Sequence, residues 1–167
     1  MAKFDPERDL PPELITAVGL LTIYATQADT GLVAILAAAT QTKIAQADAM
    51  LHSTGSAKAR ADLVRAAVGS CDIPDAGKAA SYDLLDRLVD LNAKRNEWIH
   101  GFWHLSDKPN TYQVTLYWPN RKTQEKIKPL DANTTAQVRA ICDGYLKVTQ
   151  ELCLLSTRLA NPPAPSA

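Results

Sequence analysis

The sequence predicts a mainly α protein: an up-and-down helical bundle of about five helices with a small β-hairpin inserted before the last helix. Two long segments repeat apolar residues at alternating spacings of three and four, the pattern of helices that pack along a seam. One segment, residues 111–118, alternates in period two, which is typical of a half-buried strand. Helices are therefore expected to build the core, and the hairpin to be an insertion.

The first long helix is expected to begin at Pro11 and Pro12, because proline suits the first turn of a helix. Asp29 is the only charge between Leu14 and Ala39. A helix with so few charges has more than one face covered, either in the centre of a bundle or in a dimer interface. Polar residues interrupt the segment too often for a membrane span. The expected seam consists of Leu14, Val18, Leu21, Ala25, Ala28, Leu32, Ile35 and Ala39.

A single helical domain is expected at residues 11–160, after an N-terminal arm at 1–10 and before a disordered tail at 161–167. The hairpin is expected at about 111–128, where the segment PNRK is a turn signal. Near the start of the last helix, Thr134 and Gln137 have capping-box spacing. The other helices are predicted at 43–54, at 56–70, from 75 or 81 to 102, and from about 131.

Composition restricts the classes of function. The 18 basic and 18 acidic residues cancel, so a generally cationic nucleic-acid binder is not indicated and any such contact must be local. The three cysteines, Cys71, Cys142 and Cys153, are an odd and widely spaced set, which fits a reducing compartment. The charged, proline-rich N-terminus differs from a signal peptide. We therefore expect a cytoplasmic protein.

The segment LNAKRNEWIHGFW, residues 91–103, places polar side chains on an apolar helix face. Wound at about 100° per residue, Arg95 falls at the centre of that face, with Asn96 and His100 stacked on its flank. A guanidinium there needs either a carboxylate partner, such as Asp29, or a water-filled cleft, because an unpaired buried charge is costly. The apolar residues of this face are Leu84, Leu88, Leu91, Ile99 and Phe102.

The segment RNEWIH resembles the R-x(4–6)-H signature of the HEPN superfamily, including the polar residue that commonly follows its arginine. The wider segment KRNEWIHGFW is similar to the R-N-x-x-x-H-G-x-W form in small bacterial HEPN-like proteins. An all-α bundle with the motif late in a long helix is also what that superfamily shows.

The resemblance implies metal-independent RNA cleavage of the toxin–antitoxin or phage-defence kind, without a cofactor and often between two protomers. It implies that His100 is the general acid or base for attack of the ribose 2′-hydroxyl, that Arg95 binds the phosphate and that Asn96 orients them. It also implies a homodimer, with an antitoxin or nucleotidyltransferase as a further partner. The alternative is a non-catalytic binding or assembly module in which the three residues are structural or bind a ligand.

Other motifs give weaker signals. A basic hairpin turn near aromatic residues could contact an RNA backbone, but a solvated hairpin whose aromatics pack on the bundle is the simpler interpretation. The histidines at 52, 100 and 104 do not form a metal motif, and the chain has no glycine-rich phosphate loop. The candidate RNA-binding residues of the hairpin are Arg121, Lys122, Lys126 and Lys128.

Overall fold

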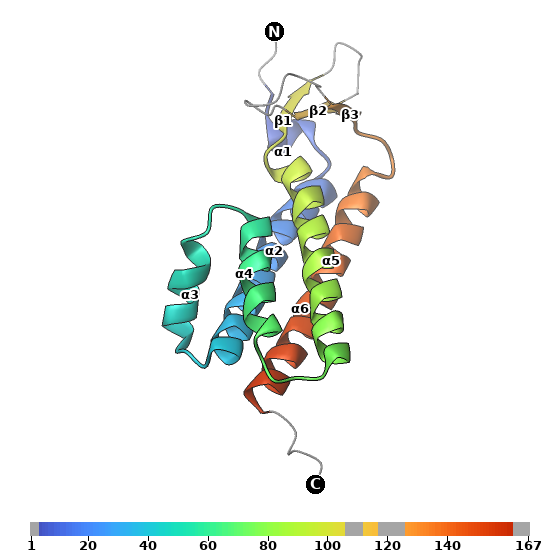
Figure 1. Cartoon of the computed structure of the whole chain (residues 1–167). Helices are drawn as coiled ribbons and strands as arrows, with labels where there is room; N and C mark the ends of the chain where they lie inside the picture. Colours follow the sequence, from blue (N-terminus) through green and yellow to red (C-terminus); the bar gives the residue numbers. More distant parts are fainter. Residues whose placement is uncertain (1–3, 106–111, 117–125, 162–167) are drawn as a thin grey trace. The chain divides into compact units, whose positions relative to one another are not determined.

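The computed structural model describes residues 4–105, 112–116 and 126–161 (Figure 1). Most of these residues are helical, so the predicted mainly α class and bundle-like fold are confirmed. In chain order the elements are α1 (Pro6–Asp9), α2 (Pro12–Thr40), α3 (Ile44–His52), α4 (Ala57–Gly69), α5 (Asp75–Ile99), β1 (Phe102–Leu105), β2 (Tyr112–Leu116), β3 (Lys126–Pro129) and α6 (Thr134–Ala160).

The chain divides into two units, and the long helices α2, α5 and α6 each contribute to both. The first unit comprises Met1–Ile23 and Ala93–Asp143, and the second comprises Tyr24–Asn92 and Gly144–Ala167. Arg95, Asn96 and His100 all belong to the first unit.

The core of the second unit is built by α2, α3, α4, α5 and α6. Tyr145 is fully buried, and its hydroxyl donates to Oδ1 of Asn92 at 3.1 Å, which satisfies the polar end of a large core side chain. The predicted seam positions Ala28, Leu32 and Ile35 are buried as expected. The other fully buried side chains include Leu36, Leu51, Val64, Val68, Leu85, Leu88 and Leu152.

Helices α2 and α6 approach closely at Gly31. A Cβ atom on Gly31 would lie 3.0 Å from Cβ of Leu152 and 3.1 Å from its Cδ1. Because Cβ is fixed to the backbone of α6, the two helices would have to separate to accept it. Glycine at this position therefore sets the distance between α2 and α6.

Ion pairs join the helices of the second unit at its surface. Arg87 contacts Glu151 of α6, with Nη1 3.1 Å from Oε1, and it also pairs with Asp83. Its hydrogen bond holds the pKa of the Glu151 carboxyl below the ordinary value. Arg65 pairs with Asp86, so α5 is tied to α4 as well.

Replacing Glu151 by glutamine is expected to lower the free energy of unfolding by less than about 1 kcal/mol, because both partners are partly exposed. A carboxyl whose pKa is lowered on folding stabilises the native state fully above its ordinary value of 4.5. That contribution disappears as the pH falls through the lower native pKa. Urea unfolding at about pH 6.5 and about pH 3 should therefore show a smaller difference at the lower pH.

The first unit contains α1, the beginning of α2, the end of α5, the strands and the beginning of α6. Residues 1–10, expected to form an arm, include the short helix α1. Asp5 caps it by accepting a hydrogen bond from the amide of Glu7 at 3.2 Å. The carboxylate of Asp9 accepts from the amide of Asp5 at 2.8 Å and pairs with Arg8, which lowers the pKa of Asp9. Local hydrogen bonding thus folds this segment.

The end of α5 differs from the prediction. The helix ends at Ile99, whereas Phe102, predicted to be helical, begins strand β1. The three strands form an antiparallel sheet in the order β1-β2-β3, in which Trp103 lies opposite Val114. The aromatic residues after Gly101 suit a strand, and pairing with β2 supplies the backbone partners that a helix would otherwise provide. The turn predicted at 119–122 lies outside the described residues.

The start of α6 also uses a different cap from the predicted one. Reciprocal hydrogen bonds join Asp131 and Thr134, with the amide of Asp131 2.8 Å from Oγ1 of Thr134. The carboxylate of Asp131 also accepts from the amide of Asn133 at 2.9 Å. The predicted pairing of Thr134 with Gln137 is therefore replaced by an interaction with Asp131, three residues before the helix begins.

Helix α2 is long and apolar enough to cross a membrane by length and composition. Half of its most apolar 18-residue window is buried inside the protein, and a core helix of a soluble protein passes the same test.

Helix α2 ends at Thr40, after which Gln41 adopts a left-handed conformation with φ of 54°. The amide of Thr42 then bonds back to the carbonyl of Ala37 at 3.0 Å, which caps the helix end.

Candidate functional site

The candidate site lies at the C-terminal end of α5. Arg95 and Asn96 are in its last two turns, and His100 is the first residue after the helix. The amide of His100 donates to the carbonyl of Asn96 at 3.1 Å, so the helical hydrogen-bond pattern extends to the histidine. The predicted spacing of the three residues is thus realised on one helix end.

The guanidinium of Arg95 contacts both of the other residues. Its Nη1 donates to Oδ1 of Asn96 at 3.0 Å and lies 3.5 Å from Nε2 of His100. Arg95 is half-buried, whereas His100 is exposed. Nε of Arg95 is buried and has no hydrogen-bond partner in the described part of the chain. The group that carries the charge is therefore held next to an imidazole that solvent can reach.

This arrangement fits a proton acceptor beside an anion-binding group. A guanidinium N–H can only donate, so the ring nitrogen of His100 can take part in this contact only as an acceptor. Arg95 has five N–H donors. Nη1 donates to Asn96, and the buried Nε has no hydrogen-bond partner among the described residues. The remaining donors suit the planar recognition of a phosphate or carboxylate.

Two tryptophans fix this end of α5 to the sheet. Trp98 is buried and Trp103 of β1 is half-buried, with ring centroids 6.1 Å apart and planes inclined by 41°. This distance and tilt are typical of aromatic pairs that stabilise a core. Both residues therefore anchor the helix end.

Asp29, the carboxylate that the sequence offers for Arg95, has another partner. Its Oδ2 lies 3.5 Å from Nη2 of Arg60 on α4, and both side chains are largely buried. This pair could not be predicted, because the short helix that carries Arg60 has no sequence feature that shows it faces α2. Arg95 itself contacts Asn96 and His100.

The basic residues predicted on the hairpin are only partly described. Lys126 and Lys128 are in β3, opposite Leu116 and Val114 of β2. Arg121 and Lys122 lie outside the described residues. The structure therefore provides a strand for two of the four candidates and leaves their contribution to RNA binding as a prediction.

The other titratable groups do not form a second site. No group of three metal-ligating side chains occurs among the described residues. His52 pairs with Asp48 at 3.3 Å on α3. Cys71, Cys142 and Cys153 are free thiols, and burial raises the pKa of the Cys142 thiol, which makes it a poor nucleophile at neutral pH.

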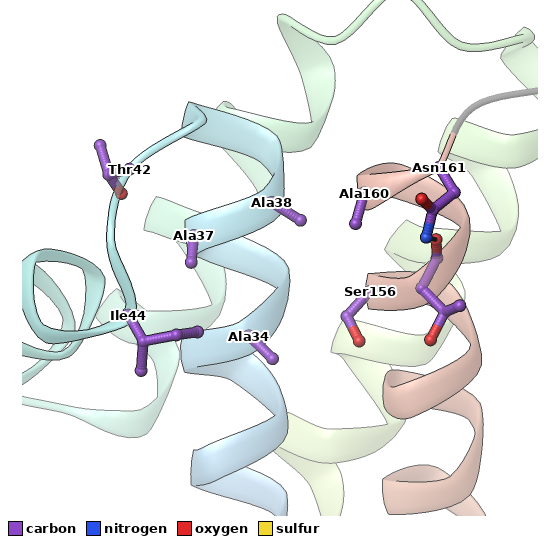
Figure 2. Close-up of a pocket in the computed structure, with 9 residues that line it drawn as sticks. Ala34, Ala37, Ala38, Thr42, Ile44, Ser156, Ala160 and Asn161 are labelled. Carbon is purple, nitrogen blue, oxygen red and sulfur yellow. Dashed lines mark hydrogen bonds between the residues drawn. The ribbon is translucent and has the colours of Figure 1, made fainter.

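A pocket of about 370 Å³ lies in the second unit, between the ends of α2 and α6 and the start of α3 (Figure 2). Its lining has no titratable side chain. The hydroxyls of Ser156 and Thr157 donate to the carbonyl of Cys153 at 2.9 Å, so their hydrogen atoms are not directed to a ligand. The pocket thus offers space but no acid–base chemistry. It is lined by Ala34, Ala37, Ala38, Thr42, Ile44, Ser156, Thr157, Ala160 and Asn161.

No family model, curated protein or solved structure matches this chain. The HEPN resemblance therefore depends on the motif of Arg95, Asn96 and His100 and on the helical context, without a matched relative. The class that the fold and the site define is a mainly helical protein with an arginine–histidine pair at an exposed helix end.

Proposed function

We propose that this protein is an HEPN-like, metal-independent endoribonuclease of the toxin or defence kind. The observation that carries the proposal is the contact between the Arg95 guanidinium and Nε2 of His100 at 3.5 Å, at a solvent-accessible helix end. Phosphodiester cleavage at a ribose needs an anion-binding group and a proton acceptor side by side. The pair supplies both without a metal ion.

In the proposed reaction, the His100 imidazole removes the proton of the ribose 2′-hydroxyl. The 2′-oxygen attacks the adjacent phosphorus, and the bond from phosphorus to the 5′-oxygen breaks. Arg95 binds the non-bridging oxygens, where negative charge increases in the transition state. The departing 5′-oxygen takes a proton from water, so the products are a 2′,3′-cyclic phosphate and a 5′-hydroxyl. Asn96 keeps the guanidinium oriented through its 3.0 Å hydrogen bond.

The finer architecture belongs to the same proposal. We expect an up-and-down bundle in which the hairpin forms an insertion beside the site. Arg121, Lys122, Lys126 and Lys128 would guide the RNA backbone by charge. A cytoplasmic homodimer, controlled by an antitoxin or nucleotidyltransferase partner, would fit a nuclease that must be kept inactive.

A second candidate function is a non-catalytic binding or assembly module. It is favoured by the fact that Nη1 of Arg95 already contacts Asn96 and His100 within its own segment. Such a cluster could stabilise the helix end or bind a carboxylate or phosphate without cleaving it. Ligand binding without turnover would distinguish this function from the first.

The test is incubation of the purified full chain with structured RNA in EDTA, next to the same sequence as DNA. We expect cleavage of RNA alone, with 2′,3′-cyclic phosphate ends, because attack requires the 2′-hydroxyl. A single 2′-deoxy substitution at the cleaved position should stop the reaction there. Failure to cut any RNA, together with saturable anion binding that Arg95→Ala removes, would favour the binding module.

A further inference from the structure

Trp103 has an aromatic surface that the fold leaves partly uncovered. It is half-buried, whereas Trp98, the residue that its ring contacts, is buried. The contact between the two rings therefore covers only part of the Trp103 side chain, and solvent reaches the rest. An indole that is held by one aromatic contact and is otherwise open can stack a second planar group at little cost in side-chain entropy.

The backbone keeps Trp103 close to the candidate site. Three residues separate it from His100, so their Cα atoms are at most about 11 Å apart. The chain also changes from helix to strand within this interval, because α5 ends at Ile99 and β1 begins at Phe102, which shortens the separation further. A nucleotide that adjoins a phosphate bound at Arg95 can therefore reach Trp103.

The strand register places a candidate RNA-binding cation at the same level of the sheet. Trp103 is opposite Val114 of β2, and Val114 is opposite Lys128 of β3. Neighbouring strands lie about 4.8 Å apart, so Trp103 and Lys128 are separated by about 10 Å across the sheet. A single strand of nucleic acid carries planar bases on a phosphate backbone, and this level carries an aromatic residue for the first and a basic residue for the second.

We propose that Trp103 stacks an unpaired base of the nucleotide next to the phosphate at Arg95, so that the site accepts single-stranded RNA, such as a loop, and rejects a duplex. The inference rests on the proposed function, which makes RNA the ligand of Arg95 and His100. A base inside a duplex is stacked between its neighbours and must leave the stack before it contacts a side chain. Because every base has a π-face, Trp103 selects an unpaired structure rather than a particular base.

The test measures binding of 2′-O-methyl RNA to the full chain, as a single strand and annealed to its complement. The blocked 2′-oxygen prevents cleavage, so binding is measured by itself. The wild type should bind the single strand at least about tenfold more tightly, and Trp103→Leu should remove about tenfold or more of that affinity. Leucine retains apolar contact with Trp98 but has no π-face, whereas Trp103→Phe should keep most of the affinity. Tyr82→Leu, which removes a half-buried aromatic ring of the second unit, is the matched control and should bind like the wild type.

Abasic substitution of the RNA gives a second measurement. At one position of the strand, loss of the base should weaken wild-type binding by about the same factor as Trp103→Leu. The variant should lose no further affinity at that position, because both changes remove the same contact. Additive losses at every position would overturn the proposal, since Trp103 would then act only through the fold. Equal affinity of the wild type for single strand and duplex would overturn it too. Binding with the expected preferences but without cleavage of unmodified RNA would support stacking by Trp103 and contradict the nuclease.

Discussion

Replacing His100 by alanine should lower the rate of RNA cleavage by a factor of about 10²–10⁴, the usual contribution of a positioned general base. The side chain is exposed, and its described contact is the 3.5 Å approach of Arg95, so its loss should hardly change the stability of the fold. Single-turnover cleavage of a labelled RNA, with circular dichroism to check folding, measures the effect.

His52→Ala is the matched control for this experiment. His52 also lies at the end of a helix and is exposed, and it pairs with Asp48. Its replacement should leave cleavage unchanged, so a loss confined to His100→Ala would exclude both a contaminating nuclease and a general effect of removing histidine. If His100→Ala cleaves as fast as the wild type, the proposed catalytic role is wrong.

Arg95→Lys separates charge from geometry at the same site. Lysine keeps the positive charge but loses the planar set of donors that can contact Asn96, His100 and two phosphate oxygens together. Cleavage should therefore fall even though the net charge is unchanged. Because the Nε of Arg95 is buried, thermal unfolding must be measured in parallel. A stable Arg95→Lys protein with full activity would contradict phosphate recognition by a guanidinium.

The helices could be predicted because their signal is local. Apolar residues spaced three and four apart place the seam of α2 on one face whatever lies against it. In the structure these positions are buried except for Val18 and Ala39, which are half-buried. The arginine, asparagine and histidine of the site are likewise neighbours on one helix end, so their contacts follow from their spacing.

Features that depend on distant partners could not be predicted in the same way. Phe102 continues the apolar pattern of α5, yet it pairs with Thr115 of β2, and only the presence of that strand decides the helix end. The partner of Asp29 is Arg60, which the sequence gives no reason to select from the other arginines. The pocket of Figure 2 combines three separate segments. Each of these depends on packing between elements, which a one-dimensional pattern does not contain.

Because α2 and α6 approach closely at Gly31, replacing Gly31 or its neighbour Leu152 should cause a large loss of stability. Gly31→Val should lower the free energy of unfolding by about 1–3 kcal/mol, because the added methyl groups meet Leu152 where a Cβ alone would already lie 3.0 Å away. Leu152→Ala should cost about 2–5 kcal/mol, since this side chain is fully buried. Urea unfolding of each variant measures both effects. Thr30→Val is the control for valine in α2, because Thr30 is exposed, and it should change the free energy by less than about 0.5 kcal/mol.

The double variant Gly31→Val/Leu152→Ala tests whether the contact itself causes the loss. Removing Leu152 beyond its Cβ creates space beside the new valine, so the double variant should be more stable than the sum of the two losses by about 0.5–3 kcal/mol. Strictly additive losses would mean that the strain comes from valine itself or from the Cβ atom of residue 152, which alanine keeps, and not from the Leu152 side chain beyond Cβ.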